Sequence, residues 1–168
     1  MNKFSLIIES FLKRTFRVEK EIEPFFWEKK TLSEMTNAEW EMLCDGCGKC
    51  CLYKIDNEDG TKTLFTDIAC RLLDTERCSC KLYKYRQEVV SDCLKITMED
   101  LAKNPRWVPK TCAYYLLYTG QKLKDWHPLI SGNKESVHEA KVSTRGRVIS
   151  ENDTDDALED HIVDWDDI

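Results

Sequence analysis

One short stretch of the sequence concentrates residues that bind metals. The stretch "LCDGCGKCCLYK", residues 43–54, contains Cys44, Cys47, Cys50 and Cys51. Two cysteines separated by two residues can turn both sulfurs onto one metal ion. Gly46 and Gly48 permit positive φ angles, which lets backbone amides point at the thiolate sulfurs and offset their charge. The stretch therefore predicts a thiolate metal site.

The spacing leaves the kind of site open. Cys44, Cys47 and Cys50 have the C-x2-C-x2-C pattern with which bacterial ferredoxins hold three irons of a cluster, but Cys51 follows directly, without the usual spacer. Side chains of adjacent residues diverge. Adjacent Cα atoms, about 3.8 Å apart, are also closer than the roughly 4.4–6.8 Å of an unstrained disulfide. We therefore expect Cys50 and Cys51 to serve two different centres, or one of them to be a spare thiol.

All nine cysteines lie between residues 44 and 112. The five that follow the first stretch are Cys70, Cys78, Cys80, Cys93 and Cys112. Two four-thiolate sites would use eight of the nine cysteines. Cys93 and Cys112 have the strongest alternative role, as small buried hydrophobic residues. Because thiolates suit zinc, iron and iron–sulfur clusters alike, the expected cofactor is zinc or iron, including a possible iron–sulfur cluster.

The rest of the sequence favours a cytoplasmic protein with reduced thiols. The chain has 168 residues and no apolar run that approaches the roughly 20 residues of a membrane span. Its first residues, "MNKFSLIIESFLKRTF", read as an amphipathic helix rather than as a secretory signal. Cytoplasmic thiols stay reduced, and an odd number of cysteines cannot pair completely into disulfides. We therefore expect metal or redox chemistry and no membrane partner.

Charge divides the chain into two parts. Residues 148–168 contain nine acidic residues and no lysine or arginine, which leaves 22 acidic against 25 basic residues in 1–147. We expect one cysteine-cluster metal-binding domain over 1–147, helical over 1–43 and with its cysteine core over 44–112. Residues 148–168 are expected to form a flexible acidic tail. The alternative is a docking or self-shielding segment anchored by Ile162, Val163, Trp165 and Ile168. Neither part is basic enough to favour nucleic-acid binding.

Short elements must position the cysteines. Apolar residues at helical spacing predict a helix over residues 4–16. A second helix is expected over residues 36–43, where Thr36 and Glu39 have capping-box spacing, and it leads directly into the first cysteine stretch. Alternating residues over 51–70 predict a β-hairpin that turns at "NEDG" and brings its two terminal cysteines together.

The segments that carry the later cysteines are less regular. Residues 71–93 show no clear pattern, whereas residues 96–105 and 111–120 predict two short helices. Residues 141–150, "KVSTRGRVIS", predict a final strand. The three aromatic residues 25–27 are expected to pack on the core. The expected fold class is therefore α+β, a small irregular metal-stapled domain with short helices and a β-hairpin.

Candidate residues other than the cysteines give weaker signals. His127 and His138 are candidates for metal ligation or proton transfer, although a lone histidine is more often a hydrogen-bonded packing residue. His161, in the acidic tail, is expected to do neither. Arg145 and Arg147 are candidates for binding an anion or the tail, with strand-edge solubility as the commoner role. The sequence has no nucleotide-binding glycine loop, no H-E-x-x-H and no nucleophile elbow, which favours a protein without catalytic residues.

With these features together, the chain resembles the YcgN family of bacterial cysteine-cluster proteins. That family belongs to a wider group described as zinc- or iron-chelating domains with a C-x2-C-x2-C-C core. The matching stretches, within residues 25–147, are "FFWEKKTLSEMTNAEWEMLCDGCGKCCLYKI", "IACRLLDTERCSC", "WVPKTCAYYLL", "WHPLISG" and "SVHEAKVSTRGR". The resemblance implies that the first four cysteines match the core and the other five match later family cysteines. One departure is "VVSDC", where a proline is expected before Asp92, and it bears on local geometry.

Three functions are consistent with these observations. The first is a cytoplasmic protein that folds around bound zinc or iron, including an iron–sulfur centre. The second is an iron–sulfur redox enzyme or electron carrier. The third is a zinc-stabilised module that recruits a protein partner. The sequence specifies neither that partner nor an oligomeric state.

Overall fold

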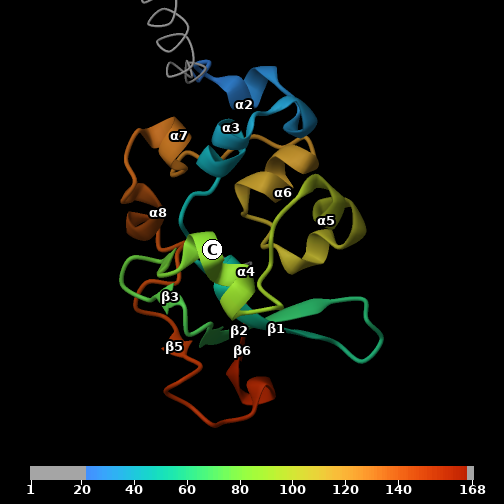
Figure 1. Ribbon diagram of the computed structural model, residues 1–168, viewed down its shortest axis with the longest axis vertical. Helices are drawn as coiled ribbons and strands as arrows, with labels where there is room; N and C mark the ends of the chain where they lie inside the picture. Colours follow the sequence, from blue (N-terminus) through green and yellow to red (C-terminus); the bar gives the residue numbers. More distant parts are fainter. Residues whose placement is uncertain (1–21, 166–168) are drawn as a thin grey trace, which may run out of the picture.

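The chain combines short helices with a small β-sheet. The computed structural model describes residues 22–165, and the helix expected over residues 4–16 lies outside the described residues. Both kinds of element are present, which confirms the α+β class. In Figure 1, helices α2, α3, α5, α6 and α7 occupy one half of the molecule and the strands occupy the other.

The elements are short throughout the described region. The α-helices are α2 (Phe26–Lys29), α3 (Asn37–Met42), α4 (Arg86–Val89), α5 (Met98–Lys103), α6 (Ala113–Tyr118), α7 (Pro128–Ser131) and α8 (Ser136–Glu139). The 3-10 helices are η1 (Leu32–Glu34), η2 (Lys49–Cys51), η3 (Tyr83–Tyr85), η4 (Pro105–Trp107) and η5 (Leu158–His161). The strands are β1 (Leu52–Asp56), β2 (Thr63–Ala69), β3 (Leu73–Asp74), β4 (Ser79–Cys80), β5 (Ile149–Ser150) and β6 (Ile162–Val163). Within residues 22–165, no helix has the length and apolar character that a membrane crossing requires.

Strand β2 is the centre of the four-stranded sheet. Strand β1 pairs with it antiparallel, with Leu52 opposite Ala69 and Asp56 opposite Thr63, which confirms the expected β-hairpin. Strand β5 pairs parallel to the end of β2, and β6 pairs antiparallel to its middle. The strand expected over residues 141–150 is thus limited to its last two residues.

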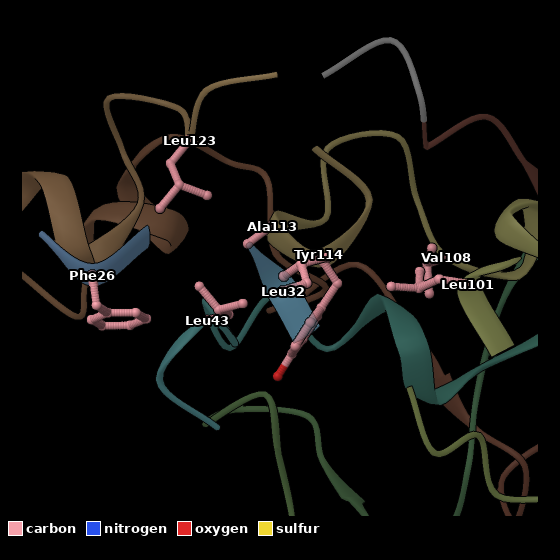
Figure 2. Close-up of a cluster of buried hydrophobic side chains, with 8 residues drawn as sticks. All are labelled: Phe26, Leu32, Leu43, Leu101, Val108, Ala113, Tyr114 and Leu123. Carbon is pink, nitrogen blue, oxygen red and sulfur yellow. The ribbon is translucent and has the colours of Figure 1, made fainter. Parts of the chain in front are cut away.

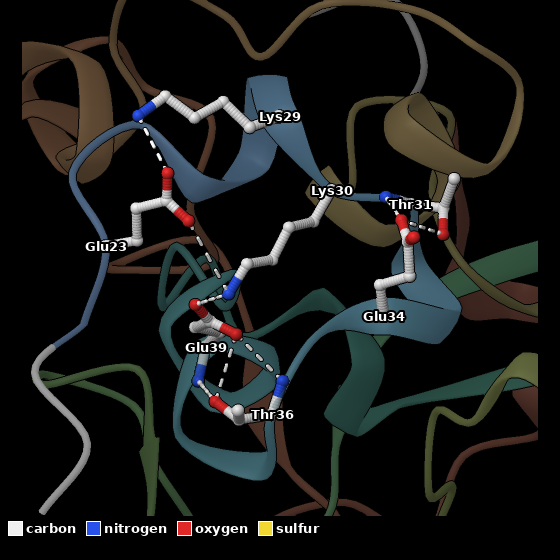
Figure 3. A network of polar contacts seen from close by, with 7 residues as sticks. All are labelled: Glu23, Lys29, Lys30, Thr31, Glu34, Thr36 and Glu39. Atoms are coloured by element: carbon white, nitrogen blue, oxygen red, sulfur yellow. Dashed lines mark hydrogen bonds and ion pairs between the residues drawn. The ribbon is translucent and has the colours of Figure 1, made fainter.

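Helix α3 begins at the capping box that the sequence predicts. The Glu39 N–H donates to Thr36 Oγ1 at 3.3 Å, and the Thr36 N–H donates to the Glu39 carboxylate at 2.8 Å. Glu39 is only 2% exposed, and Lys30 Nζ lies 2.5 Å from its carboxylate, so this buried charge is paired. Figure 3 shows that a second capping box, between Thr31 and Glu34, stands beside the first. Together these contacts fix the path of the chain into the cysteine stretch.

The helices enclose the larger hydrophobic cluster, which reaches two of the cysteines. Its buried members, shown in Figure 2, are Phe26, Leu32, Leu43, Leu101, Val108, Ala113, Tyr114 and Leu123. Leu43 immediately precedes Cys44, and Ala113 immediately follows Cys112. A second cluster of Leu52, Ala69, Leu73 and Trp165 lies against the sheet, and Cys51 packs on it. Each hydrophobic cluster therefore anchors residues next to cysteines that are distant in sequence.

Two segments differ from the sequence expectations. Of the aromatic residues 25–27, Phe26 is buried and Trp27 packs on the helical cluster, but Phe25 is 57% exposed, so that prediction is wrong for Phe25. Residues 71–93, expected to be irregular, contain the β3–β4 hairpin and α4. The hairpin turn places Cys78 at φ 52°, a left-handed conformation that is uncommon outside glycine. Because a cysteine stands where a glycine would mark the turn, the sequence does not predict this hairpin.

Residues 149–165 run along the sheet, whereas the sequence favours a flexible tail. Trp165 is 3% exposed, and its indole N–H donates to the Thr66 carbonyl at 3.1 Å. Lys49 Nζ donates to the Trp165 carbonyl at 3.1 Å, and the Arg147 guanidinium lies 4.4 Å from the centre of the Trp165 ring. Of the four anchors named for the docking alternative, Trp165 is buried, Ile162 and Val163 are exposed, and Ile168 lies outside the described residues.

Candidate metal centre

The first cysteine stretch forms the turns that its glycines predict. Gly46 and Gly48 have φ angles of 76° and 81°. The Gly46 N–H bonds to the Cys44 thiol, and the Lys49 N–H bonds to the Cys47 thiol, and each bond favours a lower pKa of its thiol. Amides directed at sulfur stabilise thiolates, as they do around bound metals. The local backbone is therefore arranged to hold negative sulfurs.

Cys112 and Cys70 have amide partners of the same kind. Cys112 is the N-cap residue of α6, and the N–H groups of Tyr114 and Tyr115 favour a lower pKa of its thiol. The Leu72 N–H lies 3.5 Å from Cys70 Sγ. Four cysteines from three separate parts of the chain thus receive backbone N–H groups at sulfur.

Three thiols around the first stretch, Cys44, Cys47 and Cys112, lie within electrostatic reach of Cys50. Burial, followed by the charges of Asp45, Cys112 and Cys50, raises the pKa of Cys47 well above its ordinary value. The Cys44 residue is exposed, yet loss of hydration at its thiol, followed by the charge of Cys50, raises its pKa to about 12. Burial, with smaller contributions from Asp45 and Cys50, raises the pKa of Cys112. Without a cation, burial therefore favours the protonated form of Cys44, Cys47 and Cys112.

The Asp45 carboxylate adds a negative charge to this group. Asp45 is 8% exposed, and its Oδ1 accepts a hydrogen bond from the Cys47 N–H at 3.0 Å. Its Oδ2 is the buried side-chain oxygen that lacks a hydrogen-bond partner among the described residues. A buried carboxylate oxygen without a partner is costly. A cation held by the nearby sulfurs would offset the charge of Asp45.

Cys50 and Cys51 lie between this first group of thiols and a second group, which contains Cys51, Cys70, Cys80 and Cys93. Their sulfurs are 3.9 Å apart. The hydrogen bond from Cys51, helped by the Lys54 charge, lowers the pKa of Cys50 to about 7. The same bond, followed by burial and the charges of Cys50, Cys70 and Cys80, raises the pKa of Cys51. The adjacent thiols are therefore in contact, closer than their expected divergence implies, while Cys51 faces a different set of neighbours.

Cys93 completes this second group. Burial raises the pKa of Cys93, opposed by the Arg86 charge and reinforced by Cys50, Cys70 and Cys80. The Cys70 N–H donates to the Cys51 carbonyl at 2.9 Å, which places the two ends of the hairpin side by side, as expected. Cys80 reaches the group through β4, where it pairs with Leu73.

Lys54 supplies positive charge between the two groups. Its Nζ donates to the carbonyls of Leu52 at 2.8 Å and Cys50 at 3.1 Å. Burial lowers the pKa of Lys54, and the charges of four thiols favour a higher value. Those thiols are Cys50, Cys51, Cys47 and Cys93. Lys54 is therefore a charge partner for thiolates from both groups.

Cys78 lies against Gly48 of the first stretch and has a hydrogen-bond partner of its own. Its residue is 5% exposed, and Thr144 Oγ1 donates to its sulfur at 3.4 Å. The Thr144 N–H donates in turn to the Cys47 carbonyl at 2.8 Å. Cys78 thus packs behind the first stretch, where it supports the backbone.

The histidines have partners other than the thiols. His127 is 1% exposed and accepts from the Leu129 N–H at Nδ1, so Nε2 carries the proton and donates to the Leu43 carbonyl at 3.1 Å. Burial lowers the pKa of His127 and favours this neutral form. His138 Nδ1 contacts Ser143 Oγ at 2.7 Å, and His161 Nδ1 contacts Asp67 Oδ1 at 2.7 Å. These contacts match the hydrogen-bonded packing role.

The two candidate arginines also have different partners. Arg145 bonds to the Glu76 carbonyl and the Glu135 carboxylate, each at 2.7 Å. Arg147 donates to the Lys141 carbonyl at 2.9 Å and stacks on Trp165. Arg147 therefore contacts the C-terminal segment, which was one of its two candidate roles.

The sulfurs do not form a preformed metal site within the described residues. All nine cysteines are free thiols. Within residues 22–165, no three cysteine, histidine or carboxylate side chains stand close enough together to hold an ion as they lie. A metal would require the sulfurs to draw closer together than they lie here.

Sequence reasoning missed two charged residues of the site. Asp45 lies inside the C-x2-C turn and Lys54 lies on β1, both next to recognised cysteines. Each is polar at a position where an apolar residue would suit burial, but the sequence does not show that the position is buried. Their proximity to cysteines was the available signal.

Comparisons with known proteins place the chain in a family. It matches no protein-family model and no solved structure. It is 52% identical over 141 residues to a UPF0260 protein of Rhizobium leguminosarum bv. trifolii, covering 83% of this chain and 88% of that protein. It is 54% identical over 139 residues to a UPF0260 protein of Rhizorhabdus wittichii, covering 83% and 94%. A UPF0260 protein of Cellvibrio japonicus is 50% identical over 141 residues, covering 83% and 95%. The chain therefore belongs to the UPF0260 family.

Proposed function

We propose that the protein binds zinc or iron, including an iron–sulfur centre, through cysteine thiolates in the cytoplasm. The observation that carries this proposal is the set of backbone N–H groups directed at the sulfurs of Cys44, Cys47, Cys70 and Cys112. A buried cysteine that serves only as a small hydrophobic residue has no need of amide donors at sulfur. Thiolates bound to a metal do benefit from them.

The charges of the site fit a cation. The buried Asp45 carboxylate lies beside thiols that become negative when a metal binds them, and its Oδ2 has no hydrogen-bond partner among the described residues. The pKa values of Cys47 and Cys112 are raised because burial and the Asp45 charge disfavour their ionisation. A bound metal would supply the missing positive charge and deprotonate the thiols. The resemblance to the YcgN family, with its C-x2-C-x2-C-C core, supports the same proposal.

Metal analysis of the reduced protein tests the proposal. The full chain is purified without oxygen, and zinc, iron and acid-labile sulfide are measured together with the visible spectrum. We expect bound zinc or iron in the wild type and a clear loss in a Cys44→Ser/Cys47→Ser variant. His138→Gln is the matched control, because His138 bonds to Ser143 and lies outside both thiol groups. The proposal would be overturned by a folded wild-type protein that contains no metal as purified and binds none when zinc or iron is added.

The same measurement decides between the roles open to such a site. Brown protein with equal iron and sulfide would favour a redox centre, whose reversible bleaching by dithionite can then be followed. Colourless protein with bound zinc would favour a structural centre in a module that recruits a partner protein.

A further inference from the structure

We infer that the cysteines form two adjoining four-thiolate centres that meet at the Cys50–Cys51 peptide, and that Cys78 belongs to neither. The first centre comprises Cys44, Cys47, Cys50 and Cys112. The second centre comprises Cys51, Cys70, Cys80 and Cys93. This division rests on the proposed metal-binding function and specifies the ligands of each metal.

The first centre is defined by mutual charge effects and by its supports. Cys50 raises the pKa of Cys44, and Cys112 and Cys50 both raise the pKa of Cys47. Cys112 is far from the other three in sequence, but the helical hydrophobic cluster contains both Leu43 and Ala113, the neighbours of Cys44 and Cys112. The partnerless Asp45 Oδ2 lies in this group and points independently to a cation there. These four thiols therefore form one set.

The second centre is built on strand pairing. The backbone bond from Cys70 to Cys51 and the pairing of Cys80 with Leu73 bring three cysteines to one end of the sheet. The Leu73 N–H also donates to the Cys70 carbonyl at 2.8 Å, which ties β3 to that end. Cys93 feels the charges of Cys50, at the boundary, and of Cys70 and Cys80. Helix α4 approaches through the Arg71 bond to the Val89 carbonyl at 3.2 Å. These four thiols form a set that does not need Cys112.

The boundary between the centres falls within one dipeptide. Cys50 acts on Cys44, Cys47 and Cys112 of the first centre and, across the boundary, on Cys93, whereas Cys51 responds to Cys70 and Cys80 of its own centre. The two sulfurs are 3.9 Å apart, so the centres would be immediate neighbours. Lys54, whose charge partners are Cys47, Cys50, Cys51 and Cys93, offsets negative charge from both.

Cys78 is excluded because its sulfur is already engaged. Thr144 Oγ1 donates to it at 3.4 Å, and the residue has a left-handed backbone conformation with φ 52°. Turning it toward a metal would break the Thr144 contact behind Gly48. Its role is to support the turn from behind.

A cobalt titration tests the division. Reduced, metal-free full-length protein is titrated with Co²⁺ without oxygen, and the visible and charge-transfer absorption of tetrahedral cobalt thiolate is followed. We expect an endpoint of two Co²⁺ per chain for the wild type and for Cys78→Ser. Cys112→Ser and Cys80→Ser should each keep one, and the double variant should keep none. Serine is itself a good N-cap, so Cys112→Ser preserves the start of α6.

Each contrary outcome has a distinct meaning. An endpoint of one Co²⁺ in the wild type, loss of all cobalt in either single variant, or loss in Cys78→Ser would overturn the division while leaving metal binding intact. A wild type that binds no cobalt, zinc or iron would overturn the proposed function itself. Far-UV circular dichroism of every variant separates loss of a ligand from loss of the fold.

Discussion

At the scale of single residues, Gly48 is the most tightly constrained position of the first cysteine stretch. A Cβ at this position would lie 2.5 Å from Thr144 Oγ1 and 3.3 Å from the Cys78 Cβ. Gly46 has nearly the same φ angle, but nothing lies within 4 Å of its added Cβ. Substituting Gly46 therefore measures the free-energy cost of a left-handed backbone alone. Substituting Gly48 adds the cost of the steric contact with Thr144.

We expect Gly48→Ala to lower the free energy of unfolding by about 2–4 kcal/mol, against about 1 kcal/mol for Gly46→Ala. Both variants carry the left-handed backbone penalty, but only Gly48→Ala also displaces Thr144 and its bond to Cys78. Urea unfolding of the reduced proteins measures the difference. Equal losses in the two variants would show that the contact with Thr144 has no energetic weight.

At the scale of elements, the parts of the fold that the sequence predicts are those with a pattern among neighbouring residues. Helix α3 was found because Thr36 and Glu39 form its capping box within four residues of chain. The β1–β2 hairpin was found from alternation and its turn. The pairings of β5 and β6 with β2 join residues far apart in sequence, and two-residue strands carry no periodic pattern.

The same limit applies to the candidate site. The spacing of the first four cysteines predicts them as ligands, whereas the approach of Cys112 depends on the long-range packing of the cluster that contains Leu43 and Ala113. The charge of Asp45 and the missing partner of its Oδ2 become visible only once burial is known. The docking of Trp165 likewise depends on Lys49 and Arg147, which lie in other segments.

Trp165 is the principal anchor of the C-terminal segment. We expect Trp165→Ala to destabilise the protein by about 3 kcal/mol, because it removes a buried indole and leaves a cavity. Val163→Ala, at a residue that is 38% exposed in the same segment, should cost less than about 1 kcal/mol. Thermal unfolding of both variants measures the contrast. Similar losses would mean that the whole segment, and not the indole, stabilises the sheet.

His161 makes the docking of this segment depend on pH. The hydrogen bond with Asp67, followed by its charge and that of Asp156, raises the pKa of His161. The folded state therefore favours the protonated form. Its contribution to stability is complete below the ordinary histidine pKa of about 6.5 and is lost as the pH rises through the raised folded-state value.

We therefore expect His161→Gln to lower the thermal midpoint at about pH 6 and to have little effect at about pH 9. Midpoints of the wild type and the variant, measured at both pH values in the same buffer series, give the comparison. A difference that is the same at the two pH values would rule out protonation of His161 as the cause.

At the scale of the whole molecule, the two sets of cysteines lie where the two hydrophobic clusters meet the first cysteine stretch. Leu43 and Ala113 belong to the helical cluster, whereas Leu52 and Cys51 contact the sheet cluster. Bound metal would therefore join the two halves seen in Figure 1. Metal binding and folding are coupled in such small sites.

We expect chelation under reducing conditions to cost about 5 kcal/mol or more and to lower the thermal midpoint by about 10–20 °C. The effect should shrink in the Cys112→Ser/Cys80→Ser double variant, which lacks a ligand from each thiol group. Circular dichroism with and without chelator measures it. An unchanged midpoint in a wild type shown to carry metal would mean that the metal does not hold the halves together.

The central position of β2 also sets an order of folding. Its pairing with β1 closes a short loop from Leu52 to Ala69, whereas its pairing with β5 must bring residue 68 to residue 149. The entropy cost of loop closure rises with loop length, so we expect the hairpin to form first and the remaining strands to add later. Pulse-labelled hydrogen exchange would detect early protection of β1 amides. The thiols of Cys51 and Cys70 are then brought together before Cys112 arrives, and a metal captured early would meet the hairpin thiols first.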